Sequence, residues 1–96
     1  MYYEEIKDKI FEIIGTEDIN EFVYYLKCHS DEIYNEVGNF KIVERTNDSE
    51  DIAMVVEFID HNVFIKIKGY ESSLSGERWH TIYEVFPQQK TITVYY

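Results

Sequence analysis

The chain has 96 residues, of which 19 are Asp or Glu and 9 are Lys or Arg, so its formal net charge is -10. This length predicts one domain, residues 1–96, and a content of 45% hydrophobic and 17% aromatic residues excludes a disordered acidic tail. Direct binding of nucleic acid is disfavoured, because phosphate contacts need clustered Lys and Arg. A basic partner is favoured instead, through electrostatic steering.

The cysteine content and the hydropathy pattern indicate the compartment. A single cysteine, Cys28, excludes an intrachain disulfide and fits a reducing environment. No apolar run approaches the ~20 residues that a membrane-spanning helix needs, and the start of the chain lacks the basic and apolar regions of a signal peptide. We therefore expect a cytoplasmic protein with no membrane association.

Residues 2–14 predict an amphipathic helix. Apolar side chains recur there at three- and four-residue spacing, and Gly15 follows where left-handed backbone ends a helix. The outer face carries a row of one charge sign, Glu4, Asp8 and Glu12, with a rise of ~6 Å per four-residue step. Such a row is either an ordinary solvated face or a set of carboxylates presented to a partner.

Two further helices are expected before the first strand. Asp18 and Glu21 match a capping box that begins a second helix, which extends to about residue 27 or 28. A short third helix, capped by Ser30 and ended by Gly38, fits the next residues, which also fit a direct lead into a strand. We favour the helix.

The second half of the chain predicts antiparallel strands. Residues 40–45 fit a first strand, with residues 47–49 as its turn. Residues 52–69 read as two alternating strands joined by a tight turn at His61-Asn62. In that register three cross-strand pairs are expected, namely Phe58 with Ile65, Val56 with Ile67 and Glu57 with Lys66.

The remaining residues predict a loop and a closing hairpin. Residues 69–80 break the periodicity, so we expect a loop that Trp79 anchors in the core while Glu77 and Arg78 stay exposed. A hairpin around Pro87-Gln88-Gln89 is expected to pair residues 81–86 with 90–96. The expected fold class is α+β, with two or three N-terminal helices packed on a four- to five-stranded antiparallel sheet.

No pattern of catalytic or metal-binding residues stands out. Cys28 and His29 are adjacent, whereas ligands of one metal site usually lie two to four residues apart. Ser75-Gly76 is not a nucleophile elbow, and the chain has no phosphate-binding glycine loop. We therefore expect no enzyme activity, no cofactor and no bound metal.

The last third of the chain carries the most specific pattern. Its features are Gly69-Tyr70, Ser72-Ser73, Trp79 and the ending Val85, Pro87 and Lys90-Thr91-Ile92-Thr93-Val94-Tyr95. On these residues the chain resembles small, mostly uncharacterised acidic phage and prophage proteins. It departs from them at Leu74-Ser75, where an aromatic residue and an aspartate are expected. The resemblance implies a phage origin and, by class analogy, an inhibitor of host defence such as an anti-CRISPR protein.

The charge and the resemblance together give a functional hypothesis. We expect a stoichiometric inhibitor that mimics nucleic acid and binds a basic nucleic-acid-handling host protein, with a CRISPR effector as the first candidate. The expected partner-binding residues are Glu4, Asp8, Glu12, Glu17, Asp18, Glu21, Asp31 and Glu32. Two alternatives stay open, an immunity protein that neutralises a toxin nuclease and a phage accessory or assembly protein. The target, the oligomeric state and the choice between the helices and the 70–80 loop as contact surface also stay open.

Overall fold

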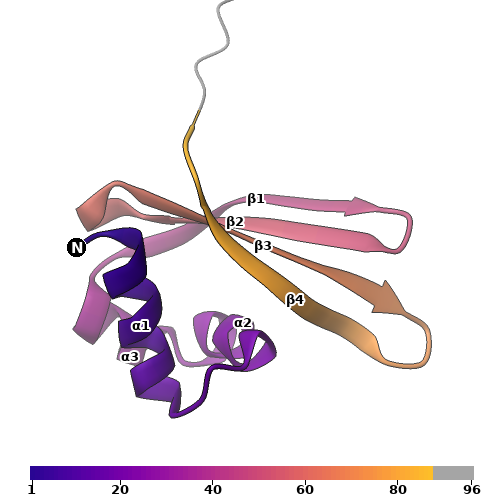
Figure 1. The fold of residues 1–96 in the computed structure, drawn as a ribbon, viewed down its shortest axis with the longest axis horizontal. Coiled ribbons are helices and arrows are strands. Elements are labelled where there is room, and N and C mark those ends of the chain that lie inside the picture. The colour runs from indigo at the N-terminus through magenta and orange to yellow at the C-terminus, as the bar shows by residue number, and fades with distance from the viewer. Residues whose placement is uncertain (88–96) are drawn as a thin grey trace, which may run out of the picture.

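The structure is a computed structural model that describes residues 1–87. Its elements are α1 (Tyr3–Ile14), α2 (Ile19–Cys28), α3 (Ser30–Val37), β1 (Phe40–Asp48), β2 (Asp51–Phe58), the 3-10 turn η1 (Ile59–His61), β3 (Val63–Ser72) and β4 (Gly76–Val85). The strands form one antiparallel sheet in the order β1-β2-β3-β4. The three helices pack on one face of that sheet (Figure 1), which confirms the predicted α+β class.

The core lies between the helices and the sheet. Each helix contributes one apolar stripe, and β2 and β3 contribute every second side chain, as the two-residue period of a strand requires. The largest fully buried side chains are Phe22, Phe58, Ile6, Ile10, Ile33, Met54, Ile65, Ile67, Val37 and Val56. The other face of the sheet has no helix on it, so its side chains, apart from the small Ala53, are half-buried or exposed.

Two glycines end helices as the sequence predicts. Gly15 follows α1 with a φ of 83°, and Gly38 follows α3 with a φ of 85°. Both values lie in the region that glycine adopts without steric cost. Residues 30–37 form the third helix, α3, so the alternative that these residues lead directly into a strand is wrong.

Two details of helix initiation differ from the prediction. The Asp18 carboxylate accepts a hydrogen bond from the backbone N–H of Asn20 at 2.8 Å. Within residues 1–87, however, the Glu21 carboxylate accepts no hydrogen bond from the backbone N–H of Asp18, so the capping box at α2 is incomplete. Helix α3 already includes Ser30, so His29 occupies the N-cap position, without a side-chain capping hydrogen bond. A capping sequence thus locates a helix start to within a residue but does not fix its hydrogen bonds.

The central hairpin keeps its predicted faces but not its predicted register. Phe58 pairs with Val63, and Val56 pairs with Ile65, so each expected pair is shifted by two residues. The connection between β2 and β3 spans residues 59–62, because η1 precedes Asn62, whose φ of 54° is left-handed. Since side chains alternate with a period of two, this shift leaves the same side chains in the core.

Residues 69–80 form the turn end of the β3–β4 hairpin and not a long loop. Strand β3 continues to Ser72 and β4 begins at Gly76, so only residues 73–75 lie in the turn. Strand β1 is likewise longer than expected, and its turn to β2 lies at Ser49-Glu50 instead of residues 47–49. The second strand of the predicted closing hairpin, residues 90–96, lies outside the described residues.

A β-bulge explains why the sequence of this hairpin reads as a loop. Lys68 pairs with Thr81 and Gly69 pairs with Trp79, so His80 is an extra residue on β4 that breaks the alternation. The strands come so close at this point that a Cβ on Gly69 would lie 2.0 Å from a carbonyl oxygen of β4. Glycine is therefore required there by the approach of the backbone.

Candidate functional site

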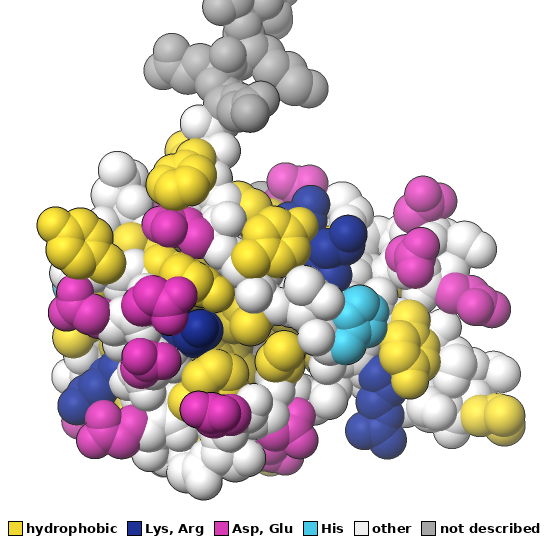
Figure 2. Space-filling view, viewed as in Figure 1, with side chains coloured by type: hydrophobic (Ala, Val, Ile, Leu, Met, Phe, Trp, Pro, Cys, Tyr) yellow, Lys and Arg dark blue, Asp and Glu magenta, His cyan; other side chains and the backbone are white. Residues whose placement is uncertain are grey.

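The helical layer presents most of the negative charge of the molecule. Residues 1–39 hold ten acidic and three basic residues, a net charge of -7. Ile6 and Ile10 bury one face of α1 against the core, which turns the row of Glu4, Asp8 and Glu12 outward. On the face of the molecule shown in Figure 2, Asp and Glu side chains gather over the helices.

The structure brings three of the eight predicted carboxylates around one hollow. Asp8 and Glu12 come from α1, and Glu17 comes from the turn that leads to α2. Together with Phe11 and Thr16 they line a shallow hollow of about 440 Å³. The tight turn after α1 is what places Glu17 beside the helix it follows.

The helix itself adds to the negative potential at this hollow. The carbonyl end of an α-helix carries a partial negative charge, and the last turn of α1 has no basic residue. At the opposite end of the row Glu4 forms an ion pair with Lys7, with 3.0 Å between its Oε2 and Nζ. The row is thus partly neutralised near the N-terminus and most negative near the hollow, which suits a cationic group from a partner.

Two titrating groups near Glu4 stay protonated at neutral pH. A hydrogen bond from its side chain to Glu4 raises the pKa of Lys7, so the ion pair persists. Burial raises the pKa of Tyr3, whose hydroxyl donates to the carbonyl oxygen of Ile82 at 3.4 Å. Tyr3 thus joins the start of α1 to β4, and Lys7 neutralises Glu4 within the helix.

The other predicted carboxylates are exposed but do not line the hollow. The Asp18 carboxylate serves as the cap of α2, and an Oε1 of Glu32 lies 3.8 Å from the Nδ1 of His29. Glu21 and Asp31 are exposed in the first turns of α2 and α3. All eight residues lie on the surface, and their role in binding stays a prediction.

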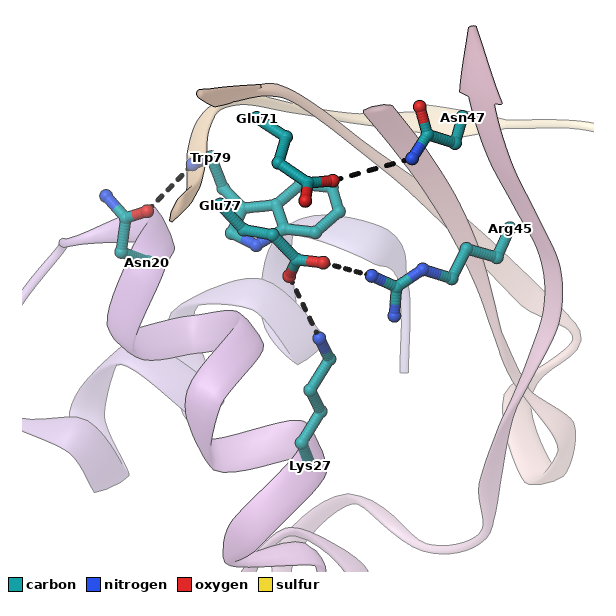
Figure 3. A network of polar contacts seen from close by, with 7 residues as sticks. All are labelled: Asn20, Lys27, Arg45, Asn47, Glu71, Glu77 and Trp79. Atoms are coloured by element: carbon teal, nitrogen blue, oxygen red, sulfur yellow. Dashed lines mark hydrogen bonds and ion pairs between the residues drawn. The ribbon is translucent and has the colours of Figure 1, made fainter. Parts of the chain in front are cut away.

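A second polar cluster joins α2 to the sheet (Figure 3). Glu77 forms ion pairs with Lys27, at 3.3 Å, and with Arg45. The backbone N–H of Trp79 donates to the Oδ1 of Asn20 at 2.7 Å. Charges of both signs pair within this cluster, so it braces the fold and offers little to a ligand.

This cluster corrects one prediction and confirms two. Glu77 was expected to be exposed, but its side chain is only 30% exposed and forms two ion pairs. Arg78 is exposed and Trp79 is buried, as expected. The sequence holds no signal for the cluster, because its members lie on α2, β1 and β4 and meet only in the folded chain.

The histidines and the cysteine do not come together. Within residues 1–87 no group of three or more His, Cys, Asp or Glu side chains is arranged to hold a metal ion. The Nε2 of His61 lies 2.9 Å from the carbonyl oxygen of Val37, and the Nδ1 of His80 lies 2.7 Å from the Oγ1 of Thr81. The expectations of no metal, no cofactor and no enzyme activity stay predictions. None of the described helices is long and apolar enough to cross a membrane.

Comparison with known proteins yields no relative. The chain matches no family model, no curated protein and no solved structure. The phage resemblance and the functions that it implies therefore stay predictions.

Proposed function

We propose that this chain binds a basic nucleic-acid-handling protein through its helical layer and blocks the access of DNA or RNA to it. The observation that supports this proposal is the hollow at the end of α1. Asp8, Glu12 and Glu17 surround it, and none of the three forms an ion pair within residues 1–87. Exposed carboxylates without internal partners are available to the Lys and Arg side chains of another protein.

The density of charge along α1 also fits this role. The row of α1 places one carboxylate every ~6 Å along the helix axis, whereas one strand of B-DNA carries a phosphate every ~3.4 Å. The row alone is therefore about half as dense as a nucleic-acid strand. Glu17, from the turn that follows α1, raises the local density beside the end of the row.

The phage resemblance suggests a CRISPR effector as the first partner to test. Such a protein holds guide and target strands in a positively charged channel. In this proposal the acidic helical layer occupies part of that channel, and the chain acts as a stoichiometric inhibitor. Long-range attraction between the channel and a chain of charge -10 speeds association at low ionic strength.

Matched charge-removing variants test the proposal. Asp8→Asn with Glu12→Gln removes two carboxylates from the hollow. Glu50→Gln with Glu71→Gln removes two exposed carboxylates that line another hollow, between the β1–β2 turn and the β3–β4 turn. Competition with labelled target DNA for a purified effector, at about 50 mM and about 200 mM salt, gives the affinity of each variant.

The two variants are expected to separate clearly. The first should lose affinity by about tenfold or more, while the second should stay within about threefold of the parent. Equal losses for both variants would mean that only net charge matters, and the hollow would not be the site. An affinity that does not fall between the two salt concentrations would also contradict the proposal, because pairs of exposed charges are screened.

A further inference from the structure

The face of the sheet without helices carries an ordered pattern of charged and apolar side chains. Strand pairing aligns one residue from each strand across this face, as in the row Glu44, Val55, Lys66 and Tyr83. Side chains of residues that pair across strands lie on the same face. The rows on either side of this one can therefore be assigned by the same register. We call this surface the open face.

Charges of opposite sign separate into two halves of the open face. The β1–β2 half has a net charge of -3 and the β3–β4 half a net charge of +3. By register, the first half holds Lys41, Glu44, Asp48, Asp51 and Glu57, and the second half holds Lys66, Lys68 and Arg78. The charges of the open face therefore cancel, although the whole chain carries -10.

These opposite charges do not pair with one another inside the molecule. Lys7, Lys9, Lys27 and Arg45, which lie away from the open face, each form an ion pair. The open face has four cations, Lys41, Lys66, Lys68 and Arg78, and within residues 1–87 none of them forms an ion pair. One reason is distance, because Glu44 and Lys66 are separated by β2 and so by about two strand spacings, or ~10 Å.

One carboxylate of the open face is also left without a hydrogen bond. The Oε2 of Glu57 is buried and has no hydrogen-bond partner among the described residues. Buried polar atoms are nearly always satisfied, so such an atom calls for a partner. Its neighbours across the strands are Lys41 and Phe64.

One part of the open face, beside the start of β3 and the end of β4, is largely apolar. A groove of about 340 Å³ runs over it, lined by Val43, Val55, Phe64 and Val85 and bounded by Glu44 and Lys66. The ring of Phe86, at the end of β4, also lines the groove and is 73% exposed. An apolar groove bordered by charged side chains is typical of a protein–protein interface.

We propose that a second copy of this chain covers the open face, with the two sheets packed face to face about a twofold axis parallel to the strands. This axis places β1 of one copy over β4 of the other. The negative half of each copy then lies over the positive half of its partner, so the surface is complementary to itself. The apolar groove of each copy is closed by that of the other, and a cation from the second copy comes within reach of Glu57.

The distribution of charge favours this contact over other modes of self-association. Two copies that met through their helical layers would bring together surfaces with a net charge of -7 each. Contact through the open face avoids that repulsion, because its charges cancel. The dimer also leaves the hollow beside α1 free for the partner of the proposed function, so the two proposals stand or fall separately.

Charge-swapped variants test the dimer without relying on the core. Lys66→Glu with Lys68→Glu makes both halves negative, and Glu44→Lys with Asp51→Lys makes both halves positive. The first variant and the second variant should each be monomeric, and an equimolar mixture of them should form a one-to-one dimer. The chain that carries all four changes should dimerise again, because its two halves once more carry opposite net charges, +1 and -1.

Sedimentation equilibrium measures these states, and far-UV circular dichroism checks that each variant is folded. The parent should be dimeric at about 100 μM, with a dissociation constant lower than that of either double variant by about 100-fold or more. A parent that stays monomeric at that concentration overturns the proposal, whatever else covers the open face. Double variants that still dimerise, or a mixture that stays monomeric, overturn the charge complementarity on which it rests.

Discussion

Replacing Trp79 with alanine tests how strongly the hairpin of β3 and β4 is held to the helices. The side chain is 5% exposed, and its backbone N–H donates to Asn20 on α2 at 2.7 Å. The ammonium group of Lys27 lies 5.9 Å from the centre of its rings. Trp79 thus connects β4 to α2 through its backbone hydrogen bond to Asn20 and through its buried ring, which lies near Lys27.

The expected loss follows from the buried area. A tryptophan buries about 150–250 Å², which at ~25 cal/mol/Å² corresponds to about 4–6 kcal/mol of hydrophobic free energy. Alanine keeps a small part of that area but leaves a cavity, so we expect the free energy of unfolding to fall by about 3–5 kcal/mol. Since a domain of this size is stable by only about 5–15 kcal/mol, the melting temperature should fall by about 15 °C or more.

Urea unfolding followed by far-UV circular dichroism measures this loss, because the substitution removes the fluorescent tryptophan. Trp79→Phe should recover more than half of it, since an aromatic ring still fills most of the space. Leu74→Ala is the matched control, because Leu74 is 97% exposed and its truncation should change stability by less than ~0.5 kcal/mol. A loss below ~1 kcal/mol for Trp79→Ala would refute its assignment to the core.

Three further predictions concern backbone approach, capping and pH. Gly69→Ala should lower the free energy of unfolding by ~2 kcal/mol or more in urea titrations, because the new Cβ would lie 2.0 Å from a carbonyl oxygen. Asp18→Ala should lower the free energy of unfolding by ~0.5–2 kcal/mol through the lost cap of α2, whereas Glu21→Ala should change it by less than ~0.5 kcal/mol. Equal losses for the two variants would indicate that Glu21 also takes part in the cap. The pKa values of Tyr3 and Lys7 are both raised in the folded chain, so their contribution to stability is present below about pH 10 and is lost as the pH rises further. Unfolding titrations between about pH 8 and 11 should show this decline, and it should be shallower in Tyr3→Phe; an unchanged decline would remove Tyr3 as a cause.

The helices could be predicted from the sequence because their signals are local. The apolar stripe of α1, the glycine after it and the cap of α2 all act within about four residues of one another. The exposure of the eight carboxylates follows from the same periodicity, since the opposite face is the apolar one. What the sequence could not supply was the grouping of Glu17 with Asp8 and Glu12, which depends on how the turn after α1 packs.

The strands were predicted less well, because their signals depend on partners that are distant in the chain. In β1 every residue after Phe40 is exposed, so no alternation marks the length of the strand. In the central hairpin, registers that differ by two residues bury the same side chains, and only the packing of η1 and Asn62 selects between them. In β4 the bulge at His80 hides the period of two.

The sequence by itself determined the class of the fold, the first two helices and the negative charge of the helical layer. Residue type and short-range spacing are sufficient for each of these, because a helix makes its hydrogen bonds within itself. Only the tertiary structure decided which carboxylates share a hollow, which charges pair around Glu77 and how opposite charges divide across the open face. Each of these arrangements joins residues from separate elements, and the pairing of strands that brings them together is fixed by the packing of the whole chain.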